Sequence, residues 1–579
     1  MEGQWYQFSS RLKDSPARIE PSNAAAQVKI ERRWEGDTCH TRITNLGASP
    51  VRVGEVVLFD LAHGLPGDTP VYAEAFQMLG QNGGTLAHPA DIGSLPDRTH
   101  YRIPEPPGFR AAAGFMLLSP AGAPNILLGF TSCRKFNGRF YYNATRLQVA
   151  CDTENLELQP GASWDMEALM AISGAERDAL LDALGDAIQI NHPRLKHDPP
   201  PVGWCSWYCF GPGVTAANIK DNLNWAARNF PALRYIQIDD GYQPHMGDWL
   251  DTGPSFGGGI QQVLKDIAAA GFEPALWVAP FIAGGDSRLF KEHPDWFVKG
   301  LDGAPLRSDT VGFGGWRMGP WYALDGTHPE AQQFLEDLFR TLRREWGCTY
   351  FKLDANYWGA LHGGLHYDPA ATRIEAYRRG MQAILRGAGD AFVLGCNAPM
   401  WPSLGLIHGQ RESGDVDRSW GAFKQIAREN FYRAWQNGRL WWNDPDCVLL
   451  TGDLKEEEFV FHATAIYATG GLLLSGDNLP SLSAARLEML HKMTPPTGVP
   501  ARFADNSFTV GRMPLAGREM VALFNWGEET AARSVSLQTK SRIKDYWTGA
   551  DLGVHEREYS VKNMPPHSAR LLEIMPTNR

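Results

Sequence analysis

The chain has 579 residues, 43% of them hydrophobic and 21% charged, with a formal net charge of −10. A chain of this length exceeds one compact core, so we expect two or three domains. The acidic balance argues against nucleic acid as a partner, because phosphate contacts need clustered Lys and Arg. The opening segment MEGQWYQFSSRLKDSPARIE lacks the apolar stretch of a signal peptide, and no run of about 18 apolar residues occurs later in the chain. We therefore expect a cytoplasmic protein with no membrane association.

The N-terminal third has the pattern of an antiparallel β domain. Short alternating runs at 26–33, 41–45 and 51–59 are separated by Gly, Pro, Asn and Asp at the spacing of a β-sandwich. Pro193 and the Pro-Pro-Pro run at 199–201 predict a stiff linker. The sequence therefore predicts an N-terminal β-sandwich domain over residues 1–195.

From Val202 onward, short apolar runs alternate with helical segments. Near-continuous apolar runs are typical of parallel strands buried on both faces. Eight strands are expected, at 202–208, 235–240, 274–280, 350–354, 392–396, 406–411, 440–443 and 472–475. Helices are expected between them, at 216–229, 260–270, 329–346, 369–387, 422–437 and 456–468. This count predicts an α/β fold, a (β/α)8 TIM barrel over residues 196–495. An open doubly wound sheet is the alternative, although no Gly-rich dinucleotide fingerprint follows the first strand.

The helical period fades after about residue 495. Runs of strand character recur at 508–510, 520–524, 534–537 and 569–573. They predict a small C-terminal antiparallel β domain over residues 496–579.

Two residues at the end of the fourth barrel strand suggest catalysis. Lys352 and Asp354 are two positions apart, so their side chains point to the same side of the strand. Active sites of such barrels lie at the carboxyl ends of the strands. A neighbouring cation lowers the pKa of a carboxylate and keeps it ionised, as a glycosidase nucleophile requires. A buried structural salt bridge is the alternative interpretation of this pair.

Other carboxylates follow the second and sixth strands. Asp415 lies in a Gly- and Ser-containing loop and is the candidate general acid, which needs a less ionising setting than the nucleophile. Glu412 and Asp417 are local rivals for this role. The pair Asp239 and Asp240 is suited to gripping vicinal sugar hydroxyls. A metal site is not expected there, because no further ligand occurs at the required spacing.

Tryptophans also fall near strand ends. Trp207, Trp249, Trp277 and Trp321 occupy such positions and are candidates for the walls of a sugar pocket, with ordinary core packing as the alternative. The eight cysteines show neither a paired framework nor zinc-ligand spacing. We expect reduced thiols and no metal.

Most of the candidate site residues lie within ten short motifs whose order resembles glycoside hydrolase family 36, the bacterial α-galactosidases related to the lysosomal α-galactosidases of family 27. The motifs are GWCSWY, QIDDG, GDWL, WVAPF, HPDW, YALD, YFKLD, LGCNAP, RESGD and WNDPDC. The family has a barrel between an N-terminal β-sandwich and a C-terminal β domain. The resemblance implies no metal or organic cofactor, and small oligosaccharide substrates such as melibiose or raffinose.

The resemblance also implies residue roles. Asp354 matches the nucleophile and Asp415 the acid/base. The substrate-binding positions are Asp239 and Asp240 at the galactose 4- and 6-hydroxyls, Lys352 at the 3- and 4-hydroxyls, Arg411 near the 2-hydroxyl, Trp207 and Trp277 as walls, and Cys396 beside the 2-position. The implied activity is that of a retaining α-galactosidase, or melibiase.

Two departures from the family pattern bear on specificity. Asn397 follows the strand-five cysteine, where the family carries a small residue, and this changes what is tolerated at C2. The segment 312–321 is longer and richer in Gly, which reshapes the leaving-group subsite. An α-N-acetylgalactosaminidase and a raffinose-synthase-like transglycosidase remain alternatives, as does a carbohydrate-binding barrel without catalysis. The sequence leaves the oligomeric state open, a homo-oligomer included.

Overall fold

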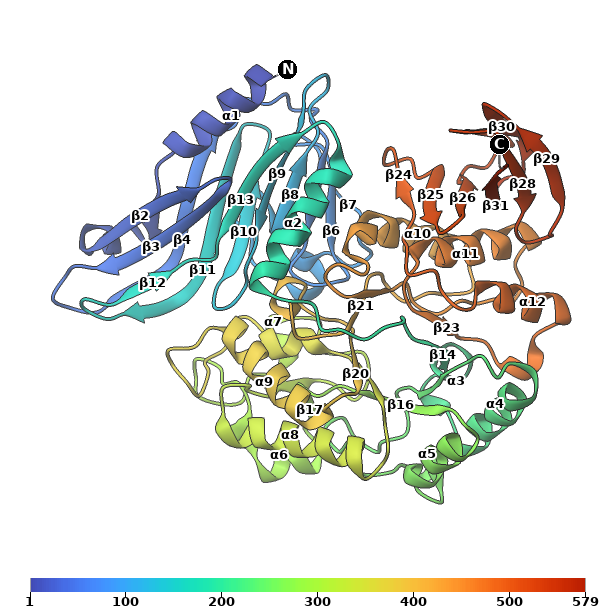
Figure 1. Cartoon of the computed structure of the whole chain (residues 1–579). Helices are drawn as coiled ribbons and strands as arrows, with labels where there is room; N and C mark the ends of the chain where they lie inside the picture. The colour runs from blue at the N-terminus through green and yellow to red at the C-terminus, as the bar shows by residue number, and fades with distance from the viewer. Residues whose placement is uncertain (1, 578–579) are drawn as a thin grey trace.

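The computed structural model describes residues 2–577. Figure 1 shows an antiparallel sheet at the N-terminal end, a barrel below it and a smaller pair of sheets at the C-terminal end. This arrangement confirms the predicted fold class. Within the described range, no helix is both long and apolar enough to cross a membrane.

The N-terminal part is a 13-stranded sheet in which every pairing is antiparallel. It follows helix α1 (Glu2–Asp14) and includes the three strands expected from the sequence, as β2, β3 and β4. The strands are β1 Arg18–Glu20, β2 Val28–Glu35, β3 Thr38–Asn45, β4 Val51–Ala62, β5 Val71–Glu74, β6 Gln81–Gly84, β7 Pro89–Asp91, β8 Arg110–Leu118, β9 Asn125–Phe130, β10 Asn137–Tyr142, β11 Arg146–Leu158, β12 Ser163–Asp165 and β13 Leu169–Gly174.

Helix α2 (Arg177–Asn191) is not predicted by the sequence pattern and packs on this sheet. Its buried side chains include Leu184 and Ile188. Gly129 of β9 makes room for Leu184, because a Cβ there would lie 2.6 Å from Leu184 Cδ1. The helix then leads through a segment without regular structure, at the predicted linker, into the barrel.

The barrel contains eight parallel strands in sequential order. They are β14 Val202–Cys205, β15 Tyr235–Ile238, β16 Glu273–Val278, β19 Tyr350–Leu353, β20 Phe392–Gly395, β21 Gly409–Arg411, β22 Trp442–Asp444 and β23 Leu473–Ser475. β14 pairs with β23, and the Leu472 amide donates to the Asn443 carbonyl at 2.8 Å, which joins the last strand to the seventh. The open-sheet alternative is therefore wrong.

The helices around the barrel match the predicted segments closely. They are α4 Ala216–Asn229, α5 Ile260–Ala269, α8 Pro329–Arg344, α9 Arg373–Ala388, α10 Trp420–Arg433 and α11 Glu456–Thr469, with α12 Ala484–Met493 and the short α3 Trp207–Phe210, α6 Arg288–Glu292 and α7 Ser308–Val311. α8 begins at Pro329, where His328 accepts from the Glu330 amide, and buries Leu335, Leu338 and Leu342. Proline suits this first position because its missing N–H has no partner there. A two-stranded antiparallel sheet, formed by β17 Ile282–Gly284 and β18 Trp321–Ala323, is inserted between β16 and β19.

The C-terminal part is antiparallel, as predicted. A six-stranded sheet contacts α11 through β26 and β31, and a two-stranded sheet completes this part, which runs from orange to dark red in Figure 1. Their strands are β24 Arg502–Phe503, β25 Val510–Leu515, β26 Arg518–Asn525, β27 Ala531–Ser536, β28 Ser541–Asp545, β29 Asp551–His555, β30 Glu558–Met564 and β31 Ser568–Pro576. The domain limits at 195 and 495 stay a prediction.

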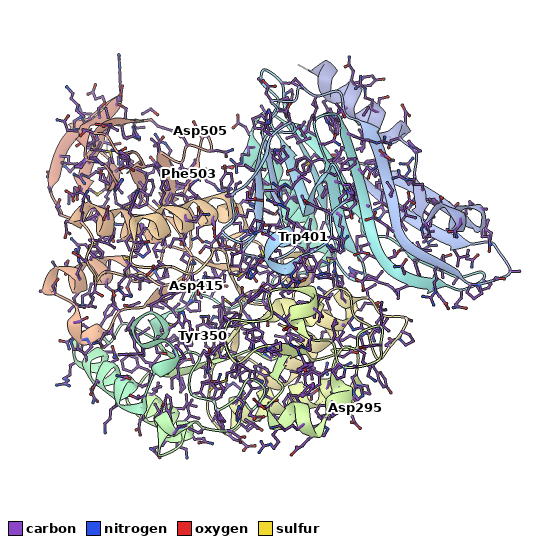
Figure 2. The ribbon with its side chains drawn as sticks, turned by 180° about the vertical axis from the view of Figure 1, so that it is seen from behind. Asp295, Tyr350, Trp401, Asp415, Phe503 and Asp505 are labelled. Atoms are coloured by element: carbon purple, nitrogen blue, oxygen red, sulfur yellow. The ribbon has the colours of Figure 1, made fainter. Side chains whose placement is uncertain are left out.

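The N-terminal sheet is joined to the barrel by buried polar contacts. Trp401, labelled at this junction in Figure 2, donates its Nε1–H to the Phe130 carbonyl at 2.8 Å. Arg433 of α10 forms an ion pair with Glu74 of β5, and both side chains are fully buried. A buried pair of this kind needs good geometry to offset its desolvation, so the relative position of the two parts is tightly specified.

Candidate active site

A cavity of about 500 Å³ opens at the carboxyl ends of the barrel strands. This volume lies within the usual range for small-molecule sites. Its wall combines predicted barrel residues with unexpected ones: Trp207, Asp239, Asp240, Trp277, Lys352, Asp354, Asn397, Gly414 and Asp415 from the barrel strands and their loops, Phe313 and Trp316 from the segment before β18, Ala422, Gln425, Ile426 and Glu429 from α10, and Leu79, Ser94, Leu95 and His100 from the N-terminal part.

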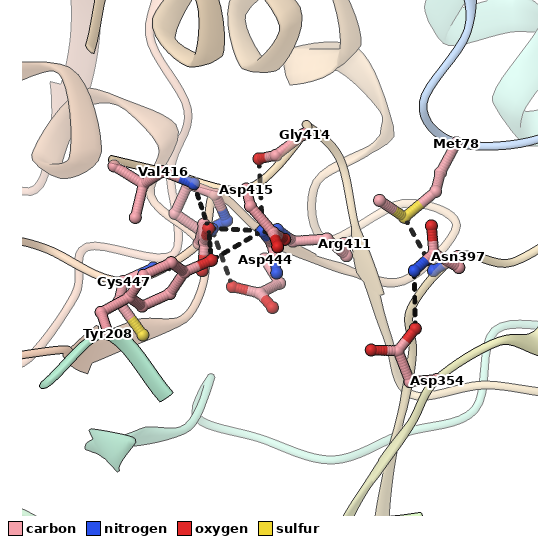
Figure 3. Close-up of polar contacts among 12 residues, drawn as sticks. Met78, Tyr208, Asp354, Asn397, Arg411, Gly414, Asp415, Val416, Asp444 and Cys447 are labelled. Atoms are coloured by element: carbon pink, nitrogen blue, oxygen red, sulfur yellow. Dashed lines mark hydrogen bonds and ion pairs between the residues drawn. The ribbon is translucent and has the colours of Figure 1, made fainter. Parts of the chain in front are cut away.

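Asp354 follows β19 and is held by three donors. Its Oδ2 accepts from Trp277 Nε1 at 3.0 Å. Its Oδ1 accepts from the Ala355 amide at 2.6 Å and from Asn397 Nδ2 at 2.7 Å. Figure 3 shows Asn397 aimed at this carboxylate. The orientation of the carboxylate is therefore fixed on both oxygens.

Lys352 acts to lower the pKa of Asp354, as expected from the sequence, but the net pKa is not low. Burial raises the pKa of Asp354, and this effect outweighs Lys352 and the three donors, which act to lower it. Lys352 Nζ donates to Asp239 Oδ2 at 3.0 Å. Burial acts to lower the pKa of Lys352, but Asp239, with a smaller contribution from Asp354, holds it well above its usual range. The lysine is thus paired directly with Asp239 and acts on Asp354 only as a nearby charge.

The two aspartates after β15 both line the cavity and have different partners. Asp239 Oδ2 also accepts from Gln237 Nε2 at 2.7 Å. Asp240 accepts from Gln243 Nε2 at 2.7 Å and forms an ion pair with Arg317, whose Nε lies 3.0 Å from Asp240 Oδ2. Arg317 lies in the Gly-rich segment 312–321, and sequence reasoning missed it.

Asp415 lies on the loop after β21 with 66% of its side chain exposed. Its Oδ1 accepts from Arg411 Nη2 at 2.8 Å. Of its rivals, Glu412 is fully buried against Trp441 and Asp417 is exposed, and neither lines the cavity. Asp415 is therefore the carboxylate of this loop that faces the site.

Arg411 is placed beneath this loop and does not line the cavity. It is 1% exposed and pairs with both Asp415 and the buried Asp446. The Tyr208 hydroxyl also accepts from Arg411 Nη2, at 3.2 Å. Figure 3 shows this network on one side and the pair formed by Asp354 and Asn397 on the other. Arg411 thus supports Asp415 from below.

The four tryptophans proposed as walls differ in their position relative to the cavity. Trp207 and Trp277 line the cavity, whereas Trp249 and Trp321 do not. Trp249 is 1% exposed and packs edge-on behind Trp277 with ring centroids 5.8 Å apart. Cys396 is 2% exposed and is not part of the wall either. Their positions at strand ends do not reveal that these side chains point into the packed interior.

Part of the wall comes from a segment that gives no signal in the sequence. His100 belongs to a single π-helical turn, Asp97–Tyr101, between β7 and β8. Its ring stacks on Phe313 with centroids 4.0 Å apart, and burial lowers the pKa of His100 to about 4.

Trp316 stands edge-on against Trp321 and is 38% exposed. Phe313 and Trp316 both belong to the Gly-rich segment 312–321, which therefore forms part of the outer wall.

In residues 2–577, no cluster of three or more His, Cys, Asp or Glu side chains has an arrangement that could hold a metal ion.

The sequence of this chain is similar to a family model and to curated glycosidases. Residues 190–381 match the Melibiase family model. The chain is 30% identical over 176 residues to the "A type blood alpha-D-galactosamine galactosaminidase" of Flavonifractor plautii, which covers 28% of this chain and 16% of that protein. It is 26% identical over 257 residues to the bifunctional α-galactosidase/sucrose kinase AgaSK of Mediterraneibacter gnavus. This match covers 42% of this chain and 26% of that protein. The matches thus span about a quarter or less of these two relatives.

Solved structures are similar over much more of the chain. The α-galactosidase TtGalA of Thermus thermophilus is 25% identical with a TM-score of 0.65, covering 84% of this chain and 98% of that one. The family 36 α-galactosidase AgaA of Geobacillus stearothermophilus has a TM-score of 0.67 at 13% identity, covering 95% and 81%, a likeness of fold. These findings confirm the predicted relationship to the α-galactosidases.

Proposed function

We propose that this chain, a relative of the α-galactosidases, is a retaining exo-glycosidase that hydrolyses terminal α-D-galactosides. The observation that carries the proposal is that Asp354 and Asp415 line the same cavity. One carboxylate is buried and fixed by three donors, and the other is exposed on a loop. Retaining glycosidases use two carboxylates, one as nucleophile and one as general acid and then base. We assign the first role to the fixed Asp354 and the second to Asp415.

The reaction is a double displacement. Asp354 attacks the anomeric carbon while Asp415 gives a proton to the glycosidic oxygen, so the bond to the leaving group breaks and a galactosyl ester forms on Asp354. Asp415, now ionised, takes a proton from water, which attacks the same carbon and releases Asp354. Two inversions at one carbon leave the α configuration unchanged.

The cavity wall supports a small oligosaccharide as substrate. Asp239, Asp240 and Lys352 supply charged partners for sugar hydroxyls at its inner end. Aromatic rings at Trp207 and Trp277 suit the apolar face of a pyranose. Leu95, His100, Phe313 and Trp316 surround the space that remains for the leaving group. The TtGalA structure is a complex with p-nitrophenyl α-D-galactopyranoside, which supports an aryl galactoside as the first probe.

The test is kinetic and stereochemical. Asp354→Ala should lose most of kcat on an aryl α-galactoside, and Asp415→Ala should lose roughly 10²–10⁴-fold, the usual contribution of a general acid. Azide should rescue Asp354→Ala as the β-galactosyl azide and Asp415→Ala as the α-azide, because only the second retains the covalent step. Asp417→Ala is the matched control, because Asp417 is an exposed carboxylate two residues after Asp415. This variant should keep full activity.

Two measurements separate the alternatives. A panel of aryl α-glycosides tests the sugar, and preference for the N-acetylgalactosaminide would replace the proposed substrate. Product analysis with sucrose present tests transfer, and trisaccharide in place of free galactose would make the enzyme a transglycosidase. No turnover of any aryl α-glycoside would leave a carbohydrate-binding barrel and refute the proposal.

A further inference from the structure

The loop after β20 connects Asp354 to the N-terminal sheet. Asn397 stands at its start with φ of 42°, a left-handed conformation that Asn tolerates better than most residues. Its side chain donates to Asp354 Oδ1 at 2.7 Å. Its own carbonyl accepts from the Tyr357 amide at 2.6 Å, and its amide approaches Met78 Sδ at 3.1 Å. Asn397 is thus held from both sides, once by the barrel and once by the N-terminal part (Figure 3).

The N-terminal part contacts this loop through its main chain as well. The Met78 amide donates to the Ala398 carbonyl at 3.1 Å, and the Met400 amide donates to the Phe76 carbonyl at 2.8 Å. Residues 76–79, which we name the strap, therefore pair with residues 398–400 like two short antiparallel strands. Such main-chain pairing fixes the path of the loop on which Asn397 depends.

The strap itself is rigidly built. Gln77 is fully buried, and its Nε2 donates to the Leu95 carbonyl at 3.0 Å and to Asp97 Oδ1 at 2.9 Å. Its Oε1 accepts from the Leu79 amide at 2.8 Å. Asp97 also accepts from the Phe76 amide at 2.7 Å. A buried network with its groups satisfied holds one conformation.

From these contacts we propose that Asn397 is a positioning residue for the nucleophile, and that the N-terminal β domain takes part in catalysis by holding Asn397 through the strap. This inference rests on the proposed function of Asp354. The hydrogen bond from Asn397 fixes one carboxylate oxygen while Trp277 fixes the other, so the rotation of the carboxylate is set by two parts of the chain. A reacting group held in an attack-ready orientation avoids part of the entropic barrier.

The main test replaces the side chain without disturbing the backbone. Asn397→Gly accepts the left-handed conformation and removes the side chain with its donor to Asp354. A hydrogen bond to a charged group predicts a loss of roughly 10- to 100-fold in kcat with little change in KM. The acidic limb of kcat/KM should also move to higher pH, because Asp354 must be ionised and loses a contact that favours its ionised form.

Two further variants sharpen the test. Asn397→Asp keeps the shape but places a second carboxylate beside Asp354, and should move the acidic limb further in the same direction. Met78→Leu keeps the bulk of the strap residue while removing its sulfur, and should produce a smaller shift. Its effect should be less than additive with Asn397→Gly, since Met78 acts on Asp354 only through the Asn397 side chain, which the second substitution removes.

Asn155→Gly is the matched control. Asn155 is also left-handed, with φ of 57°, but is exposed in the N-terminal sheet and distant in sequence from the strap. It should leave kcat and the pH profile unchanged.

The outcomes are distinguishable. If the wild-type protein hydrolyses α-galactosides but Asn397→Gly keeps kcat within twofold and an unmoved acidic limb, the positioning role is refuted and the proposed function stands. If the wild-type protein is inactive on every aryl α-glycoside, the proposed function itself fails. A fall in kcat with an unmoved pH profile in both Asn397 variants assigns a merely structural role to Asn397 and also refutes the inference.

Discussion

Replacement of Arg433 by Met should loosen the N-terminal sheet from the barrel. Arg433 donates to Glu74 through Nε at 3.1 Å and to the carbonyls of Glu412 and Gly80 at 2.7 Å each. It also donates to the Met78 carbonyl, within the strap. The side chains of both Arg433 and Glu74 are completely buried. Methionine fills a similar length but supplies no donor.

The expected magnitude depends on the charge that stays behind. Without Arg433, the carboxylate of Glu74 remains buried with only Gln436 Nε2 at 3.2 Å and the Ala75 amide at 3.1 Å as donors. Removing one partner of a buried ion pair typically lowers the free energy of unfolding by about 3–5 kcal/mol. Because Arg433 also binds the strap, we expect kcat to fall with stability.

Urea unfolding, monitored by circular dichroism and by activity, measures this effect. The double variant Glu74→Gln/Arg433→Met removes the orphaned charge and should recover a large part of the lost stability. Arg542→Met, which breaks a half-exposed pair with Asp551, is the control and should change stability by less than about 1 kcal/mol. A loss below about 1 kcal/mol in Arg433→Met, or no recovery in the double variant, would refute the reasoning.

Two further predictions concern pH and the leaving group. Burial raises the pKa of Glu412 to about 8 from its ordinary 4.5. The folded protein therefore binds this proton more tightly than the unfolded chain, so Glu412 lowers stability progressively as pH rises from about 4.5 to about 8. Glu412→Gln should lack this decline, and urea unfolding of both proteins at pH 5 and pH 8 checks it; parallel pH profiles would contradict it. Trp316→Ala should raise KM for an aryl α-galactoside by roughly 10-fold through lost aromatic packing. The inhibition constant of free galactose should stay unchanged. If this constant rises as much as the KM for the aryl α-galactoside, Trp316 contacts the sugar instead of the leaving group.

The barrel is predictable because its signal is local. A parallel strand buried on both faces is a short apolar run, and each predicted strand is found within a few residues of its expected limits. Helix α2 escapes prediction because its apolar residues pack on a sheet formed by distant segments. The same limit applies to tertiary contacts such as that between Arg433 and Glu74, whose residues are 359 positions apart.

The sequence indicates which residues gather at the site better than it indicates their side-chain directions and pKa values. Asp354, Asp415 and Asn397 can be placed at strand ends, and they line one cavity. The direction in which a tryptophan points depends on packing, so the sequence does not reveal that Trp249 lies behind Trp277 and outside the cavity wall. The sequence predicts a lowered pKa for Asp354 because its lysine neighbour is visible there, whereas the degree of burial that raises the pKa is not.

The cavity wall has two components with different freedom to change over evolution. Leu95 and His100 reach the outer wall from the segment between β7 and β8, and among the described residues no hydrogen bond joins them to the two proposed catalytic carboxylates, so we expect that substitutions there can retune the leaving group while the chemistry is preserved. Residues 76–79, only a short distance earlier in the chain, are bound to the loop that holds Asp354. A graft that exchanges the N-terminal part between relatives would therefore have to keep the strap and vary only the outer wall.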